Sequence, residues 1–290
     1  MQTGYVVTSG IRLFYLSEGA GPLVLLCHGF PEHSYSWRHQ LTPLAEAGFR
    51  AVALDLPGYG RSDKPDVTYD GDWVCSSLAG AITGLGASQA VMVGHDWGGL
   101  LVWPFARMYP DLTAGVIGLN TPDLARPKEP PVELMRRSGY SRTAYIVAFQ
   151  ERGAAEAWAE SDLEGFVRLF FLGPATVRKE VFTDEVLEAL AEPLRPAGAI
   201  TPPLEYYRNL DRNWELLAPY DDVSIQVPCL MISPTGDPVL RPKMADGMEE
   251  RVPDLRKVVI EDCGHWTQQE QPERTTEAML DYLTALEPWP

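Results

Sequence analysis

An aspartate stands where an apolar run gives way to a helical pattern, in the stretch VGHDWGGLLVWPFA at 93–106. Residues 94–98 read G-H-D-W-G, a spacing typical of a strained strand-to-helix turn that exposes a nucleophile. The glycines permit the turn and a close approach of backbone, and the N–H groups at a helix start favour an anion. Asp96 is therefore the expected nucleophile, although an aspartate at a helix start can also be a plain N-cap.

A carboxylate at this point implies different chemistry from a hydroxyl. A serine must lose its proton before it attacks, whereas an aspartate, with a reference pKa of about 3.9, is already ionised at neutral pH. The carboxylate can displace a leaving group at a saturated carbon and form an alkyl ester, which a histidine then hydrolyses by activating water. The expected electrophile is a carbon that bears oxygen or halogen.

Two stretches near the N-terminus resemble the α/β-hydrolase superfamily. HGFPEHSYSWR at 28–38 resembles its H-G-x-P loop, and DLPGYGRSDKP at 55–65 resembles the loop after the next strand. The resemblance implies an oxyanion hole formed by the backbone N–H groups of Phe30 and Trp97. We expect His28 to pack within its own loop rather than to act in catalysis.

The superfamily has the chain order nucleophile, acid, histidine. EDCGHWTQQEQPE follows the last apolar run and contains His265, the only histidine after Asp96, so His265 is the expected base. For the acid that orients it, Asp237 in SPTGDPVL is preferred, because it stands in the superfamily's commoner position. Asp123, after the preceding apolar run, is the alternative, since some relatives with an aspartate nucleophile have their acid there.

The leaving group separates two substrate classes. Opening an epoxide produces an alkoxide, which needs a proton donor, whereas a departing halide needs only hydrogen-bond donors. Together with HGFP, GHDWGG and EDCGHWTQ, the segments AYIVAFQERGAAEA and LEYYRNLDRNW resemble the soluble epoxide hydrolases, over nearly the whole chain. The resemblance implies that Tyr145 and Tyr207 donate hydrogen bonds to the epoxide oxygen, because phenols stay protonated at neutral pH.

Tyr207 also has a structural interpretation. Tyr207, Leu210, Trp214 and Leu217 lie on one face of a predicted helix and could form core packing. Tyr206 is about 100° around the helix, so only one of the two tyrosines can face the site.

Other activities fit the residues less well. Similar haloalkane dehalogenases commonly have Asn where Phe30 stands, and relatives that act on fluoroacetate have Arg where Trp97 stands. A haloalkane dehalogenase nevertheless remains the alternative enzyme. A non-catalytic small-molecule receptor with this fold is a further alternative, although a pure binder would not need the full set of reactive residues. An acyl esterase is not expected, because no serine occupies the turn.

Aromatic residues near these motifs predict an apolar substrate site. The run FVRLFFLG at 166–173 is accompanied by four expected substrate-binding residues: Phe30, Trp97, Phe149 and Trp266. Such a slot, closed over a charged nucleophile, suits small apolar epoxides with aryl or alkyl groups.

A sheet has to position these residues. Apolar runs rich in β-formers predict strands at 4–8, 11–17, 22–27, 50–55, 90–94, 114–119, 228–233 and 255–260, and the periodicity between them predicts helices at 36–47, 70–86, 97–109, 240–250 and 272–286. The alternation predicts the α/β class, with the α/β-hydrolase fold: a mostly parallel eight-stranded sheet with helices on both faces and an inserted helical lid. We expect a core domain of 1–121 and 219–290 and a lid of 122–218.

Composition excludes several partners and cofactors. The 290 residues include 40 acidic and 24 basic ones, a net charge of −16, which would repel nucleic acid and anionic membranes. No leader or membrane span is evident, so we expect a cytoplasmic protein. No metal-ligand spacing and no glycine-rich phosphate loop occur, so no metal or cofactor is expected. The sequence does not decide between a monomer and a homodimer. Four scattered cysteines suggest neither disulfides nor a zinc site: Cys27, Cys75, Cys229 and Cys263.

Overall fold

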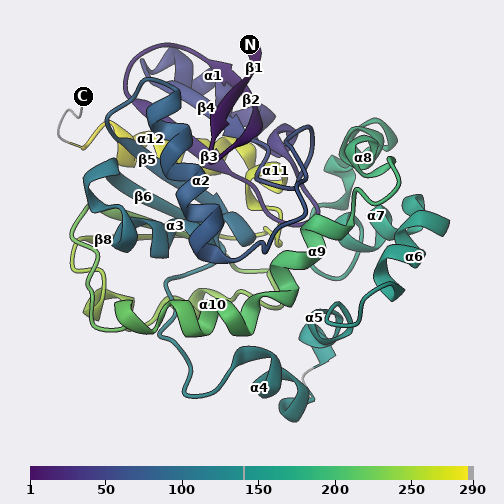
Figure 1. The fold of residues 1–290 in the computed structure, drawn as a ribbon. Coiled ribbons are helices and arrows are strands. Elements are labelled where there is room, and N and C mark those ends of the chain that lie inside the picture. The colour runs from purple at the N-terminus through teal and green to yellow at the C-terminus, as the bar shows by residue number, and fades with distance from the viewer. Residues whose placement is uncertain (140, 287–290) are drawn as a thin grey trace.

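The computed structural model describes residues 1–139 and 141–286. Its strands form one eight-stranded sheet in the order β1-β2-β4-β3-β5-β6-β7-β8 (Figure 1). β1 and β2 are antiparallel to their neighbours, and the other neighbouring pairs are parallel. The strands are Gln2–Thr8 (β1), Ile11–Glu18 (β2), Leu23–Cys27 (β3), Arg50–Leu54 (β4), Ala90–His95 (β5), Thr113–Leu119 (β6), Cys229–Pro234 (β7) and Leu255–Ile260 (β8). The predicted fold class and all eight predicted strands are confirmed.

Helices cover both faces of the sheet. α1 (Arg38–Glu46) and α12 (Pro272–Leu283) pack together on one face, and α2 (Gly71–Gly84) and α3 (Trp97–Met108) pack on the other (Figure 1). Along β3, Leu25 joins the apolar cluster beneath α2 and α3, and Leu26 joins the cluster beneath α1 and α12. A strand buried on both faces needs a continuous apolar run, which explains why such runs predicted the central strands.

The helix predicted at 240–250 is wrong. The chain forms two short 3-10 turns there, Pro242–Ala245 and Met248–Glu250. Asp246 between them is extended, and Gly247 has a φ of 75°, so a continuous α-helix cannot pass through this point. The other predicted helices are present, the one at 36–47 as a short 3-10 turn (Ser34–Trp37) followed by α1.

Between β6 and β7 the described residues form helices and no strand. Ring contacts between Phe30, after β3, and Phe149, in this segment, bring the segment over the carboxyl end of the sheet. Residue 140 of the expected lid and residues 287–290 of the expected core lie outside the described residues. The helices are α4 (Pro131–Ser138), α5 (Ala144–Ala148), α6 (Ala154–Ser161), α7 (Leu163–Phe171), α8 (Asp184–Ala191), α9 (Thr201–Arg208) and α10 (Leu210–Leu216).

Five neighbouring parallel strands end at the same edge of the sheet. The loops that follow β3, β5, β6, β7 and β8 hold Phe30, Asp96, Asn120, Asp237 and His265 respectively. The carboxyl ends of parallel strands are where open α/β sheets gather their sites. Residues as far apart in the chain as Phe30 and His265, 235 positions, therefore lie at the same edge of the sheet.

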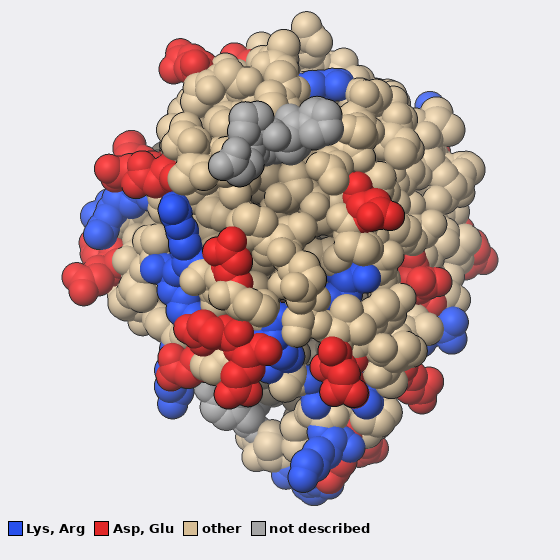
Figure 2. All heavy atoms as spheres, turned by 90° about the vertical axis from the view of Figure 1, so that its left-hand side faces the viewer, with Lys and Arg blue, Asp and Glu red and all other residues tan. Residues whose placement is uncertain are grey.

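The surface charges and the buried cysteine thiols do not indicate a functional site. On the face shown in Figure 2, acidic and basic side chains lie next to one another. All four cysteines are buried and unpaired. Among the described residues, no helix is long and apolar enough to cross a membrane. Within 1–139 and 141–286, no cluster of His, Cys, Asp or Glu is arranged to hold a metal ion.

Candidate active site

Asp96 occupies a sharp turn between β5 and α3. Its φ of 50° and ψ of −112° lie in a region that residues other than glycine rarely adopt, and such strain clusters at functional sites. The flanking glycines allow the turn because a side chain on Gly94 would collide with the backbone of Gly98, and one on Gly98 would collide with the backbone of Cys27. The sequence GHDWG thus holds the Asp96 carboxyl at the edge of the sheet.

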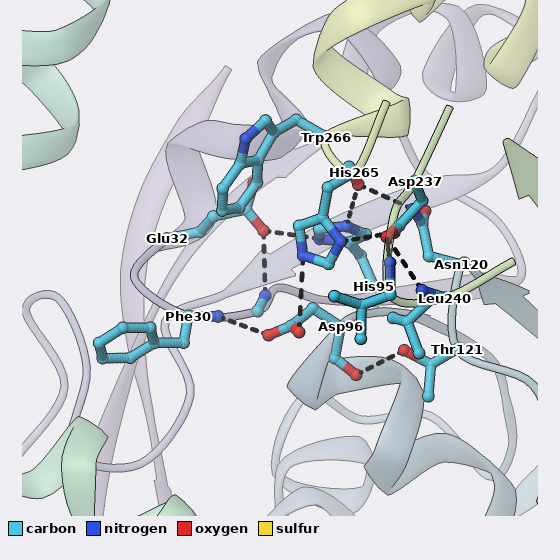
Figure 3. Close-up of polar contacts among 12 residues, drawn as sticks. Phe30, Glu32, His95, Asp96, Asn120, Thr121, Asp237, Leu240, His265 and Trp266 are labelled. Carbon is cyan, nitrogen blue, oxygen red and sulfur yellow. Dashed lines mark hydrogen bonds and ion pairs between the residues drawn. The ribbon is translucent and has the colours of Figure 1, made fainter. Parts of the chain in front are cut away.

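His265 lies between two carboxylates (Figure 3). Its Nδ1 atom is 2.7 Å from Oδ2 of Asp237, and its Nε2 atom is 3.6 Å from Oδ2 of Asp96. Burial disfavours the charged imidazolium, but the charge and hydrogen bond of Asp237 and the contact with Asp96 raise the pKa of His265 well above its usual value. The structure thus favours a protonated His265 facing an ionised Asp96.

Both carboxylates keep their charge despite burial. Burial raises the pKa of Asp96, but the hydrogen bond and charge of His265 outweigh it and lower that pKa below its usual value. Burial acts the same way on Asp237, and the charge and hydrogen bond of His265 lower its pKa to about 2. The Oδ1 atom of Asp237 accepts backbone N–H bonds from Val239 and Leu240 at 2.8 and 2.9 Å, which fix its orientation.

Asp123 has different partners from Asp237. Its carboxyl group binds Arg107 through two hydrogen bonds of 2.7 and 2.8 Å, and it also accepts from Nε of Arg251 at 2.9 Å. Paired with two arginines, the carboxyl of Asp123 joins α3 to the loop before β8. The structure brings Asp237, and not Asp123, to the ring of His265.

One backbone N–H group binds the Asp96 carboxyl directly, and a second belongs to the next residue in the chain. The N–H of Phe30 donates to Oδ1 of Asp96 at 2.9 Å (Figure 3). Trp97 is the first residue of α3, so its N–H is one of the donors that a helix start leaves without an intrahelical partner. His28 packs within the loop as expected, since its ring contacts the Gly29 carbonyl at 2.8 Å and accepts from the Leu56 N–H at 3.0 Å.

Tyr145 and Tyr207 come together from two helices of the segment between β6 and β7. Their ring centroids are 5.9 Å apart, and the Tyr207 ring lies 4.9 Å from Trp97 and 5.1 Å from Phe30. Burial, followed by nearby charges that include Asp96, raises the pKa of both hydroxyls, so both stay protonated. Tyr206 is also buried, but its hydroxyl donates to the Pro57 carbonyl at 2.7 Å, away from Asp96.

The expected substrate-binding residues divide into two groups. Phe149 and Phe30 have ring centroids 5.7 Å apart, and both contact Tyr207, which in turn contacts Trp97. Trp266 does not join them. Its ring packs against Phe171, Phe182, His95 and His265.

Sequence reasoning missed a buried polar network beneath His265. Nδ1 of His95 is 2.8 Å from Oε2 of Glu32, and its Nε2 is 2.7 Å from the His265 carbonyl. Both ring nitrogens of His95 thus lie within hydrogen-bond distance of an oxygen atom. Burial opposes ionisation of Glu32, but His95 and the other partners lower its pKa below its usual value. Glu32, a charged residue within the apolar HGFPE loop, was the sequence feature that could have indicated this network.

Asn120 was missed as well. Its side-chain N–H group donates to Oδ2 of Asp237 and to the His265 carbonyl, both at 2.9 Å. Its Oδ1 atom accepts from the Thr267 hydroxyl at 2.7 Å. Asn120 follows β6 as Asp96 follows β5, and this matching position was the signal that could have identified it.

A cavity of about 860 Å³ lies apart from these residues, between loop 60–69 and residues 192–209. Its Arg152 forms an ion pair with Glu205, and its Lys64 donates to the carbonyls of Gly60 and Ser62. None of the predicted site residues borders it, so it gives no information about chemistry at Asp96.

Known proteins resemble this chain along almost its whole length. A family model described as alpha/beta hydrolase fold matches residues 22–272. Bifunctional epoxide hydrolase 2 of Sus scrofa is 37% identical over 97% of this chain and 55% of that protein, so the chain spans about half the length of that relative. Epoxide hydrolase A of Mycobacterium tuberculosis (strain ATCC 25618 / H37Rv) is 36% identical, with 97% of each chain covered.

The similarity extends to three dimensions. The crystal structure of epoxide hydrolase A from Mycobacterium thermoresistibile superposes with a TM-score of 0.91 at 34% identity, with 99% of each chain covered. The match therefore includes the sheet and the helices inserted between β6 and β7.

Proposed function

The chain belongs to the epoxide hydrolases of the α/β-hydrolase fold family, and on that premise we propose that it adds water to an epoxide to give a vicinal diol. One observation carries the proposal. The Asp96 carboxylate lies between the Phe30 N–H and the His265 ring, and the Tyr145 and Tyr207 rings meet close to the same loops. The proposed nucleophile, base and proton donors thus lie around the same loops, which supports the proposal.

In the first step, an oxygen of Asp96 attacks a ring carbon of the epoxide. The carbon–oxygen bond breaks, and the bonding pair goes to the epoxide oxygen, which takes a proton from Tyr145 or Tyr207. The product is a hydroxyalkyl ester of Asp96. His265 is not needed as a base in this step, because the carboxylate is already ionised.

Esterification then changes the state of His265. The ester has no charge, so the contribution of Asp96 to the raised pKa of His265 is lost. His265 can release its proton, which replaces the one that the tyrosine gave away. The charge pair in the free protein thus becomes a neutral base next to the ester.

In the second step, His265 takes a proton from water as the oxygen of that water attacks the ester carbonyl carbon of Asp96. Asp237 orients the ring and stabilises the imidazolium that forms. The N–H groups of Phe30 and Trp97 stabilise the tetrahedral oxyanion. On collapse, the departing alkoxide takes the proton of the new carboxyl group, and the ionised Asp96 and protonated His265 are restored.

We further propose that residues 122–218 act as a lid on the core of 1–121 and 219–290. The lid contributes Tyr145, Phe149 and Tyr207. The rings of Phe149 and Tyr207 contact Phe30 of the core, and the ring of Tyr145 contacts that of Tyr207. A site walled by these rings suits a small apolar epoxide, because apolar walls with a few convergent polar groups are typical of such pockets.

The first test is the intact mass of the His265→Gln protein after mixing with styrene oxide and, separately, with a bromoalkane. The first step is retained and the second is blocked, so the mass should rise by that of the whole epoxide. The gain should vanish when Asp96→Asn is added. Labelling by the bromoalkane alone would support a dehalogenase instead, and labelling by neither would contradict the proposed mechanism.

A further inference from the structure

The loop that holds His265 is joined to the helical segment between β6 and β7 through one buried carboxyl group. Glu270 is the last residue of α11 (Thr267–Glu270), and its side chain is fully buried. Its Oε2 atom accepts backbone N–H bonds from Gly264, Val177 and Arg178 at 3.0, 2.9 and 2.8 Å. Its Oε1 atom accepts from the Trp266 N–H at 3.0 Å.

These four donors come from two separate parts of the chain. Gly264 and Trp266 flank His265 on either side, whereas Val177 and Arg178 follow α7. Because one carboxyl group accepts from all four, it fixes the distance between the two loops.

Further contacts tie the same two loops together. The N–H of His265 donates to the Ala175 carbonyl at 2.7 Å, and Nε1 of Trp266 donates to the Thr176 hydroxyl at 3.1 Å. A Cβ atom on Gly264 would lie 2.7 Å from Oε1 of Glu270 and 2.8 Å from the backbone nitrogen of Val177. Only glycine therefore permits this approach.

We propose that Glu270 is a positioning residue for the second chemical step. By holding the backbone on both sides of His265, it sets the direction in which Nε2 of the ring faces Asp96. The inference rests on the proposed function and deepens it, since it assigns to Glu270 a part in ester hydrolysis and none in ester formation.

Glu270 contacts the backbone around His265 and none of the groups that act in ester formation. Ester formation uses the carboxylate of Asp96, the N–H of Phe30 and the hydroxyls of Tyr145 and Tyr207. The four hydrogen bonds of Glu270 go to none of these groups. Ester hydrolysis depends on the ring of His265, whose backbone lies between two of the donors.

The variant Glu270→Gln keeps the shape of the side chain and removes one acceptor. An amide NH₂ group cannot accept, so in either orientation at least one backbone N–H faces a donor. With the amide oxygen toward Gly264, Val177 and Arg178, the unpaired N–H is that of Trp266, next to His265. We expect hydrolysis of the ester to slow about 10- to 100-fold and ester formation to change less than about 2-fold.

Rapid mixing with styrene oxide, acid quenching and intact mass measure the two steps separately. The expected result is an ester on Glu270→Gln at a steady-state level well above that of the unaltered protein. Glu156→Gln is the matched control, because the Glu156 carboxyl also accepts a backbone N–H, from Gly153 at 2.9 Å, but within the helical segment and away from His265. That control should show the ester level of the unaltered protein.

Equal slowing of both steps, or no change in either, would overturn the inference. If Glu270→Gln does not fold, Glu270→Asp retains both acceptors but withdraws them by one methylene, and a higher ester level is again the expected result. An unchanged ester level in a folded Glu270→Asp protein would then overturn it. Failure of His265→Gln to form any ester would instead refute the proposed function, and with it this inference.

Discussion

Nε2 of His265 lies 3.6 Å from Oδ2 of Asp96, so the proposed base and the proposed nucleophile form a charge pair in the free protein. The charge of Asp96 is one reason why the pKa of His265 is raised, and the charge of His265 is one reason why the pKa of Asp96 is lowered. Esterification cancels the first effect. We therefore expect the two proposed chemical steps to respond differently to pH.

Ester hydrolysis should slow as pH falls, while ester formation should not. Hydrolysis, as proposed, needs neutral His265, and Asp237, which helps to raise the pKa of His265 in the free protein, remains its partner in the ester. Formation, as proposed, needs ionised Asp96, and the hydrogen bond and charge of His265 hold the pKa of Asp96 below its usual value. From neutral pH down to about pH 4, the fraction of the protein present as ester should therefore rise. Intact mass after quenching during turnover measures that fraction, and a constant fraction across this range would contradict the proposed charge pair.

The variant Asp237→Asn should block mainly the second step. The Asp237 carboxylate raises the pKa of His265 and holds its Nδ1 atom at 2.7 Å. Without that charge the ring is no longer oriented or stabilised as an imidazolium, so hydrolysis should fall by about 10²- to 10⁴-fold. Ester formation should continue, and intact mass should detect the ester as the main species.

Asp123→Asn is the matched control for that experiment. Its carboxyl group binds Arg107 and Arg251, so the substitution removes the negative charge that faces two partly buried arginines. We expect the free energy of unfolding to fall by about 3 kcal/mol, with both chemical steps unchanged. Loss of hydrolysis in Asp123→Asn rather than in Asp237→Asn would show that the orienting acid is Asp123.

Removing the hydroxyl of Tyr145 or Tyr207 should slow ester formation. Phenylalanine keeps the ring contacts but cannot donate a proton to the epoxide oxygen. Each single variant retains one donor, so we expect a partial loss, and the double variant should lose about 10²- to 10⁴-fold. Single-turnover formation of the ester in a His265→Gln background measures this step alone.

Tyr206→Phe is the matched control for the tyrosines. Its hydroxyl donates to the Pro57 carbonyl at 2.7 Å, so its loss should destabilise the fold by about 1 kcal/mol without slowing ester formation. Thermal unfolding and the same single-turnover assay measure the two effects. A slower ester formation in Tyr206→Phe than in Tyr207→Phe would reverse the assignment of the two residues.

The secondary structure of the sheet could be predicted from local sequence. Strands buried on both faces need continuous apolar runs of about five residues, and the short length of these runs and the turn residues that bound them favour a strand over a buried helix. The helix expected at 240–250 failed because Gly247 adopts a positive φ, a backbone choice that a helical periodicity does not reveal. The sharp turn at Asp96 could be predicted from local sequence too, because the glycines of GHDWG permit it.

Where the sequence offered two similar candidates for one position in the site, only the tertiary structure showed which of them lies there. Asp123 and Asp237 each follow a strand that ends at the same edge of the sheet. In the folded chain Arg107 and Arg251 bind Asp123, whereas His265 binds Asp237. The helical repeat indicates that Tyr206 and Tyr207 point in different directions. Only the folded chain shows that it is the Tyr206 hydroxyl that binds the Pro57 carbonyl.

The network around Glu32 and Glu270 was the least predictable part. Each carboxyl group has a hydrogen-bond partner more than 60 positions away in the chain. The partner of Glu32 is His95, and one partner of Glu270 is Val177. The residue type alone does not reveal whether a glutamate side chain is buried or exposed. Whether burial is compensated depends on donors that only the folded chain brings within about 3 Å.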